Sequence, residues 1–136
     1  MRDPLREGER WLRQADVDLG AARRLADGFS ALACFHAQQA AEKALKAILY
    51  ASGERVVLGH SLAELGEAVE RRRSDYGALR GEVAKLDRYY VPTRYPNGLP
   101  AGGDPNEAFD AEDAAAAIET ARRAIEHARA LIAEGR

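Results

Sequence analysis

One alanine-rich segment, residues 33–50, constrains the fold of this chain more than any other part of the sequence. It contains no glycine or proline and few β-branched residues, so we expect it to be helical. Its polar side chains recur every three or four positions and share one stripe: His36, Gln39, Lys43, Lys46 and Tyr50. The opposite face is made mostly of small residues: Cys34, Ala37, Ala41, Ala44, Leu45 and Ile48. The segment therefore predicts a central packing helix that carries one polar groove.

The sequence before residue 53 predicts an antiparallel pair of helices. Asp3 followed by Pro4 is a typical helix start, and an apolar repeat continues from there until Gly28. About two residues then separate this first helix from the second, for which Ser30 is the predicted cap and Gly53 the predicted end. So short a connection favours a helical hairpin.

The remaining sequence predicts a third, a fourth and a last helix. Ser61 and Glu64 form a capping box that opens the third helix. The fourth helix is predicted by an apolar stripe at Tyr76, Leu79, Val83, Leu86 and Tyr90, and the last by one at Ile118, Ala121, Ile125, Ala128 and Ile132. Either Asp104 or Asp110 is the predicted cap of the last helix.

Prolines and glycines exclude regular structure from Pro92 to about Asn106, and a loop of that length in a small domain is usually functional or mobile. We therefore expect an all-α fold, an up-and-down antiparallel helical bundle with four main helices plus a short one. The long Pro/Gly-rich loop precedes the last helix, and residues 1–136 form a single domain.

Composition excludes several classes of protein. The formal net charge of −2 argues against a strongly basic nucleic-acid binder, although a local basic groove remains possible. The single cysteine, Cys34, cannot form an intramolecular disulfide and is interpreted as a small buried hydrophobe. No apolar run is long enough to span a membrane, and the first residues lack the core of a signal peptide, so we expect a cytoplasmic protein. Neither metal-ligand spacing nor a glycine-rich phosphate loop is present, so we expect no metal and no cofactor.

Three separated motifs resemble the HEPN domain family, a small all-helical module. The run CFHAQQAAEKALKA at residues 34–47 resembles the second helix of that family. The other two are Gly59-His60-Ser61-Leu62 with Leu65, and Leu86-Asp87-Arg88-Tyr89-Tyr90-Val91-Pro92-Thr93-Arg94-Tyr95-Pro96. The resemblance covers about residues 11–131 and implies a HEPN-like helical domain. It does not settle the activity, because the family includes ribonucleases and toxin–antitoxin components.

The resemblance also implies where catalysis would lie. HEPN ribonucleases are marked by an arginine, four to six residues and a histidine, which cleave RNA without a metal. Arg55 to His60 and Arg122 to His127 both have this spacing, and the late position of the family motif favours Arg122 and His127 as the catalytic pair. Arg123, however, replaces the usual small polar residue. A five-residue step rotates the pair by about 140°, so we expect His127 to face solvent or a second subunit.

Two groups of residues are candidates for binding a nucleotide or RNA. One lies where the fourth helix meets the loop, because arginine grips phosphate bidentately and tyrosine stacks on bases; pinning of the loop to the bundle is the alternative. The other is the polar stripe of the second helix, which alternatively faces water or a dimer interface. The candidate binding residues are His36, Gln39, Lys43, Arg88, Tyr90, Arg94 and Tyr95.

Three functions stay open. The first is implied by the resemblance, because members with the Tyr-Tyr…Arg-Tyr-Pro segment are commonly encoded beside a minimal nucleotidyltransferase. The pair would act as a two-component nucleotidyltransferase or as a toxin–antitoxin system, and this chain would supply the nucleotide- or RNA-binding surface, as a homodimer. The second function is a metal-independent endoribonuclease that uses Arg122 and His127 across a dimer groove. The third is a non-catalytic protein-interaction module, which would be favoured if salt bridges bury Arg94.

Overall fold

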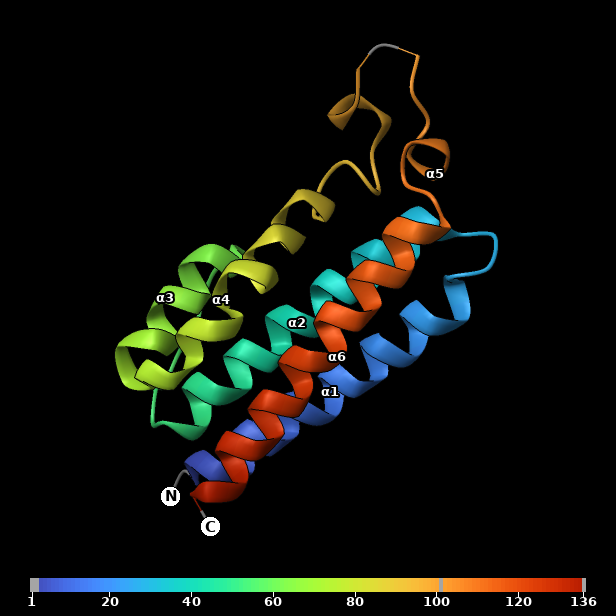
Figure 1. Ribbon diagram of the computed structural model, residues 1–136. Coiled ribbons are helices and arrows are strands. Elements are labelled where there is room, and N and C mark those ends of the chain that lie inside the picture. The colour runs from blue at the N-terminus through green and yellow to red at the C-terminus, as the bar shows by residue number, and fades with distance from the viewer. Residues whose placement is uncertain (1–2, 101, 136) are drawn as a thin grey trace.

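The computed structural model describes residues 3–100 and 102–135, and the described residues form helices and loops without a strand (Figure 1). The α-helices are α1 (Pro4–Leu25), α2 (Ser30–Ala51), α3 (Leu62–Arg72), α4 (Gly77–Ala84), α5 (Pro105–Ala108) and α6 (Ala111–Glu134). Short 3₁₀ segments are η1 (Ser74–Tyr76), η2 (Lys85–Tyr89) and η3 (Pro96–Gly98). The predicted all-α bundle is confirmed.

Helix α2 lies at the centre of the bundle. Helices α1 and α6 pack along it, and α3 and η2 cover another side (Figure 1). The predicted small-residue face of α2 is buried, as expected for close helix packing. The closest approach is to α1, where a Cβ atom added to Gly8 would lie 2.7 Å from the Ala51 Cβ atom. Two members of the predicted polar stripe, Lys46 and Tyr50, are buried as well, so the open groove is shorter than expected.

The helix starts differ in part from the prediction. Asp3 caps α1 as expected, because its carboxylate accepts hydrogen bonds from the first turn. Ser30 does not cap α2: Phe29 occupies the N-cap position, and the Ser30 hydroxyl donates to the Phe109 carbonyl. The side chain of Asn106 accepts from an α2 backbone N–H group instead, which ties α5 to the start of α2.

The fourth helix is shorter than predicted and changes its period. It ends as an α-helix at Ala84 and continues as the 3₁₀ segment η2, which has three residues per turn. Val83, Leu86 and Tyr89 then share the core face, so the prediction that Tyr90 lies in the core stripe is wrong. The tighter turn buries Tyr89 and leaves Tyr90 half-buried on the side toward α2.

The segment from Pro92 to Asn106 is less irregular than predicted. Its described residues, 92–100 and 102–106, include η3 and the start of α5, and they project past one end of the bundle (Figure 1). The buried Thr93 side chain donates to the Tyr89 carbonyl and so holds the base of the projection. The two residues predicted as alternative caps of the last helix both lie at helix starts. Asp104 precedes α5, and Asp110 caps α6 through a reciprocal capping box with Asp113.

The start of α3 is stabilised from outside its own helix. Ser61 accepts from the Glu64 backbone, as predicted, and Asp87 of η2 accepts from the backbone N–H groups of Leu62 (2.6 Å) and Ala63 (3.1 Å).

We expect Asp87→Ala to lower the free energy of unfolding by about 1–2 kcal/mol, because it leaves helix-terminal donors without an acceptor. Urea denaturation measures this change. Asp87→Asn keeps an acceptor oxygen and should cost less; equal losses in the two variants would contradict this account.

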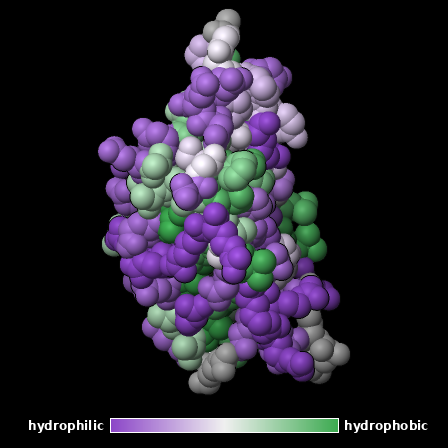
Figure 2. Space-filling view, turned by 90° about the vertical axis from the view of Figure 1, so that its right-hand side faces the viewer, coloured by the Kyte–Doolittle hydropathy of each residue, from purple (hydrophilic) through white to green (hydrophobic). Residues whose placement is uncertain are grey.

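No helix within residues 3–100 and 102–135 is long and apolar enough to cross a membrane. The face of the molecule drawn in Figure 2 is mainly hydrophilic and carries small, separated apolar patches.

Candidate functional site

A connected set of polar side chains runs along α2, between α1 and the segment that precedes α3. We call this set the α2 seam; it comprises Asp18, His36, Gln38, Gln39, Glu42, Lys43, Lys46 and His60. Buried polar groups of this kind are stable only when they satisfy one another. We therefore expect the stability of the fold to depend on the contacts within the α2 seam.

Asp18 of α1 organises the first half of the seam. The residue is 8% exposed, and its carboxylate accepts from the Lys43 Nζ atom at 2.6 Å and lies 3.3 Å from the His36 Nδ1 atom. Lys43 also donates to Gln39 at 3.3 Å. These contacts bring together the three predicted binding residues of α2 and fix the direction in which the His36 ring points.

Glu42 organises the second half. The residue is 4% exposed, and its carboxylate lies 3.1 Å from Lys46 Nζ and 3.2 Å from His60 Nδ1. The His60 carbonyl accepts from Gln38 at 3.3 Å. The ring of His60, which directly precedes the N-cap residue of α3, therefore pairs with α2.

An aromatic cage surrounds Arg94 beside the seam. The central guanidinium carbon lies 4.4 Å from the ring centroid of Phe35, 4.7 Å from that of Tyr90 and 5.1 Å from that of Tyr95. The Nε atom donates to the Tyr90 carbonyl at 2.8 Å. The His60 ring stacks on Tyr90 at 4.9 Å and joins this Arg94 cage to the seam. Tyr90, Arg94 and Tyr95 therefore lie together with the predicted residues of α2.

Arg94 makes no ion pair with any carboxylate in the described part of the chain, and its terminal Nη atoms make no hydrogen bond there. It is held by π faces and one backbone carbonyl, and such contacts attract the cation without neutralising its charge. The half-buried guanidinium consequently keeps donors for an anion from outside the protein.

Arg88 lies apart from the cage. Its Nη2 atom donates to the Tyr89 hydroxyl at 2.7 Å, and its guanidinium carbon sits 4.8 Å from the Tyr89 ring centroid. Arg88 and Arg94 are thus held by different aromatic rings, and a binding role for Arg88 stays a prediction.

Cys34 is fully buried near Arg88, and burial raises the pKa of its thiol to about 12. The thiol therefore stays protonated, as its interpretation as a hydrophobe requires.

The two candidate catalytic residues have different partners among the described residues. Arg122 pairs with Glu119 at 2.6 Å and Glu126 at 2.7 Å, and hydrogen bonds to these carboxylates raise its pKa. The His127 ring packs edge-on against Tyr76 at 5.4 Å, and its Nε2 atom is buried. His127 is therefore half-buried rather than fully turned to solvent, and its contact with a second subunit stays a prediction.

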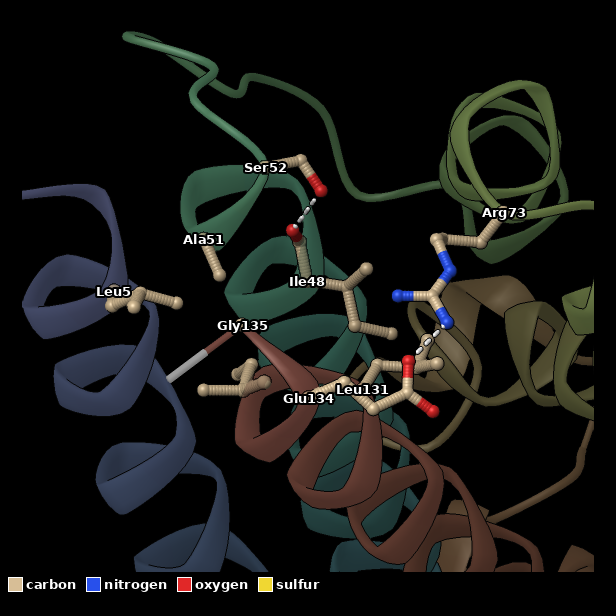
Figure 3. Close-up of a pocket in the computed structure, with 9 residues that line it drawn as sticks. Leu5, Ile48, Ala51, Ser52, Arg73, Leu131, Glu134 and Gly135 are labelled. Atoms are coloured by element: carbon tan, nitrogen blue, oxygen red, sulfur yellow. Dashed lines mark hydrogen bonds and ion pairs between the residues drawn. The ribbon is translucent and has the colours of Figure 1, made fainter.

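One cavity outside the seam lies where the start of α1 meets the ends of α2 and α6 (Figure 3). Its volume is about 270 Å³, and Arg73 pairs across its mouth with Glu134 at 2.6 Å. These two charges satisfy each other, so neither is left unpaired for a ligand. The described residues also contain no cluster of three or more histidine, cysteine or acidic side chains suited to a metal.

The binding residues predicted from the sequence did not include Asp18, Gln38, Glu42, Lys46 or His60. Asp18 interrupts the apolar stripe that contains Ala15 and Leu19, and an acid in such a stripe is a usable signal. Gln38, Glu42 and Lys46 follow one another at four-residue spacing, which places them on one line of α2. The partnership of Glu42 with His60 has no local signal because the two residues come from different elements.

The sequence model of the HEPN domain matches residues 8–131. The chain belongs to the HEPN family. The solved structure of TT1696 from Thermus thermophilus is 34% identical, with a TM-score of 0.82 over 96% of this HEPN chain and 98% of that one. The structure of ST0689, described as an archaeal HEPN homologue, is also 34% identical, with a TM-score of 0.74 over 93% of this chain and 98% of that one.

Human sacsin is 32% identical over 117 residues, which cover 83% of this HEPN chain. The chain spans 3% of the length of sacsin, so the match concerns one segment of a much larger protein. These similarities confirm the family predicted from the three motifs.

Proposed function

We propose that this HEPN protein binds the phosphate of a nucleotide, free or within RNA, at the Arg94 cage and the adjoining α2 seam. The observation that carries the proposal is the Arg94 guanidinium, which three aromatic rings hold in place and which forms no ion pair with a carboxylate of the described residues. A planar guanidinium with free Nη donors matches two phosphate oxygens at once.

The neighbouring side chains suit the rest of a nucleotide. The Tyr95 ring is exposed and offers a face on which a base can stack. His36 and His60 each direct Nδ1 toward a buried carboxylate, an arrangement that favours the proton on Nδ1 and leaves Nε2 as an acceptor. Such acceptors can receive a hydrogen bond from a ribose hydroxyl or from an amino group of a base.

The geometry gives less support to the two other functions. In a ribonuclease centred on Arg122 and His127, two carboxylates already hold Arg122, and the His127 ring packs against Tyr76 instead. An interaction module without a ligand would be favoured by salt bridges that bury Arg94, and the described residues place aromatic rings there instead.

We also propose a protein partner, a minimal nucleotidyltransferase, and a toxin–antitoxin role for the pair, as the motif resemblance implies. The same resemblance implies a homodimer. The exposed Val91 and Tyr95 side chains at the base of the projecting segment are available to such a partner. Affinity purification of the tagged protein from its own host tests the proposed partner, and recovery of the protein without a nucleotidyltransferase contradicts it.

Sedimentation equilibrium tests the proposed homodimer. A protein that stays monomeric over the whole concentration range contradicts the homodimer.

Removal of the Arg94 guanidinium should weaken nucleotide binding at least about tenfold, because charge-assisted hydrogen bonds of this kind contribute about 1.5–3 kcal/mol. The measurement is fluorescence anisotropy with a fluorescent ATP analogue on the wild type, Arg94→Ala and Arg94→Lys. The lysine variant keeps the charge but loses the bidentate fork, so we expect an intermediate affinity.

The matched control is Arg129→Ala, which removes an arginine from α6, where the side chain pairs with Asp16 outside the seam. It should bind the analogue like the wild type. The proposal is wrong if Arg94→Ala retains full affinity, or if the wild type does not bind the analogue at all.

A further inference from the structure

We propose that the ligand is a single-stranded nucleic acid that lies along α2, from the Arg94 cage to a second stacking platform at Trp11. The inference rests on the proposed function and deepens it, because it names the class of ligand and a second contact. The inference is based on aromatic rings with a cation close to them, which occur at both ends of α2, and on the polar side chains of the α2 seam between the two ends.

The platform at Trp11 is a fixed aromatic ring beside cations. The indole stacks on the Tyr50 ring with centroids 5.2 Å apart, and its Nε1 atom donates to Glu7 at 3.1 Å. Lys46 Nζ lies 5.7 Å from the ring centroid. The half-buried indole is therefore held in one orientation before a ligand arrives, which reduces the entropy lost on binding.

A cavity opens against this platform. It has a volume of about 340 Å³ and is lined by Arg10, Trp11, Gln14 and Lys43. The Trp11 ring and the Gln14 amide suit a base, whereas the two cations beside them already have acidic partners: Arg10 pairs with Glu7 at 3.0 Å and Lys43 with Asp18 at 2.6 Å. Lys43 also donates to Gln39 and Asp18, so the cavity is continuous with the seam.

The distance between the two ends excludes a single nucleotide as the ligand of both. The cage touches α2 at Phe35 and the platform touches it at Tyr50. Fifteen residues of α-helix extend about 22 Å. Stacked bases in one strand are spaced by about 3.4 Å, so a stacked strand that reaches both ends has about seven or eight nucleotides and a more extended strand has about six or fewer.

The charges between the two ends predict how such a strand binds. Asp18 offsets Lys43, and Glu42 offsets Lys46, so the middle of the seam has polar groups without a net positive charge. Stacking at the ends, rather than phosphate attraction along the whole strand, should dominate the affinity. With about one phosphate neutralised, at Arg94, the logarithm of the binding constant should fall against the logarithm of salt concentration with a slope of about −0.7.

The test compares ligands of increasing length on the full chain. Fluorescein-labelled adenosine oligonucleotides, from the mononucleotide to the decanucleotide, are titrated in an RNA and a DNA series. Affinity should rise by about tenfold or more between the dinucleotide and the hexanucleotide and then level off, because base–aromatic stacking at the second end adds to the first. The series that binds more tightly identifies the sugar.

The Trp11→Leu variant separates the two ends. It should weaken hexanucleotide binding about tenfold and leave binding of the fluorescent ATP analogue unchanged within about twofold. Because Trp11 also packs against Tyr50, Gln14→Glu provides a second variant that adds a repelling charge at an exposed position of the cavity. Its matched control, Ala130→Glu, adds the same charge at an exposed position of α6.

The outcomes distinguish this inference from the proposed function. Binding of the ATP analogue that depends on Arg94, with a hexanucleotide that binds no more tightly than a dinucleotide, would overturn the linear site and leave the proposed function intact. A duplex hexanucleotide that binds as tightly as the single strand would overturn it too, as would equal effects of Gln14→Glu and Ala130→Glu. Absence of binding by every ligand would overturn both proposals.

Discussion

Replacement of Glu42 by alanine should lower the free energy of unfolding by about 3–5 kcal/mol, because it leaves the ammonium group of Lys46 buried without a counter-charge. Both residues are nearly inaccessible, at 4% exposure for Glu42 and 6% for Lys46. The substitution also removes the partner of His60 Nδ1. Urea denaturation of the wild type and the variant measures the change, which corresponds to a fall of roughly 10–15 °C in the unfolding midpoint.

A double variant separates the loss of the counter-charge from the loss of packing. Glu42→Leu combined with Lys46→Met replaces the ion pair with apolar side chains, and it should recover most of the stability lost in Glu42→Ala, because no uncompensated charge then remains. If the free energy of unfolding of Glu42→Ala lies within about 1 kcal/mol of the wild-type value, Lys46 reaches water without its partner. The stability of the fold would then not depend on the α2 seam.

A single methyl group on Gly8 should destabilise the protein by about 2–3 kcal/mol, because it would hold the α1 and α2 backbones apart. The added Cβ atom would lie 2.7 Å from the Ala51 Cβ atom and 2.8 Å from the Ala47 carbonyl oxygen. Neither neighbour is the end of a flexible side chain, so the two helices must separate. Thermal and urea denaturation of Gly8→Ala measure the cost.

Gly20→Ala is the matched control on the same helix. A Cβ atom at Gly20 meets nothing within 4 Å, so the substitution should stabilise α1 by about 0.5–1 kcal/mol through its higher helix propensity. Opposite signs for the two substitutions would show that close approach, rather than helix propensity, determines the choice of glycine at position 8. A stabilised Gly8→Ala variant would contradict the packing described for α1 and α2.

Periodicity predicted the parts of the fold that depend on local sequence. The apolar faces of α1, α2 and α6 were predictable because each long helix repeats its pattern over several turns. The fourth helix was predicted less well, because the change from α to 3₁₀ geometry after Ala84 leaves no mark in composition. That change exchanges the places of Tyr89 and Tyr90, so only the structure shows which tyrosine is available to the site.

The candidate site was predicted in two halves, one on α2 and one near Arg94. The sequence could not show that they meet, because Phe35 and Tyr90 touch the same guanidinium from distant parts of the chain. It also could not show that Asp18 balances a lysine of α2, because that contact depends on how α1 packs against α2.

The pairing of Arg122 with two acids of its own helix was visible in the sequence at spacings of three and four residues. This pairing argues against that arginine as a phosphate ligand, because the two carboxylates already occupy its donors.

Titration of the ¹⁵N-labelled protein with ATP, followed by two-dimensional NMR, tests the central claim most directly. The claim is that Arg94 and the α2 seam form the nucleotide site. It predicts that the Arg94 Nε–Hε signal and the backbone amides from Phe35 to Lys46 shift together and saturate at one affinity. Shifts confined to α6 around Arg122 and His127, with the Arg94 signal unmoved, would contradict it.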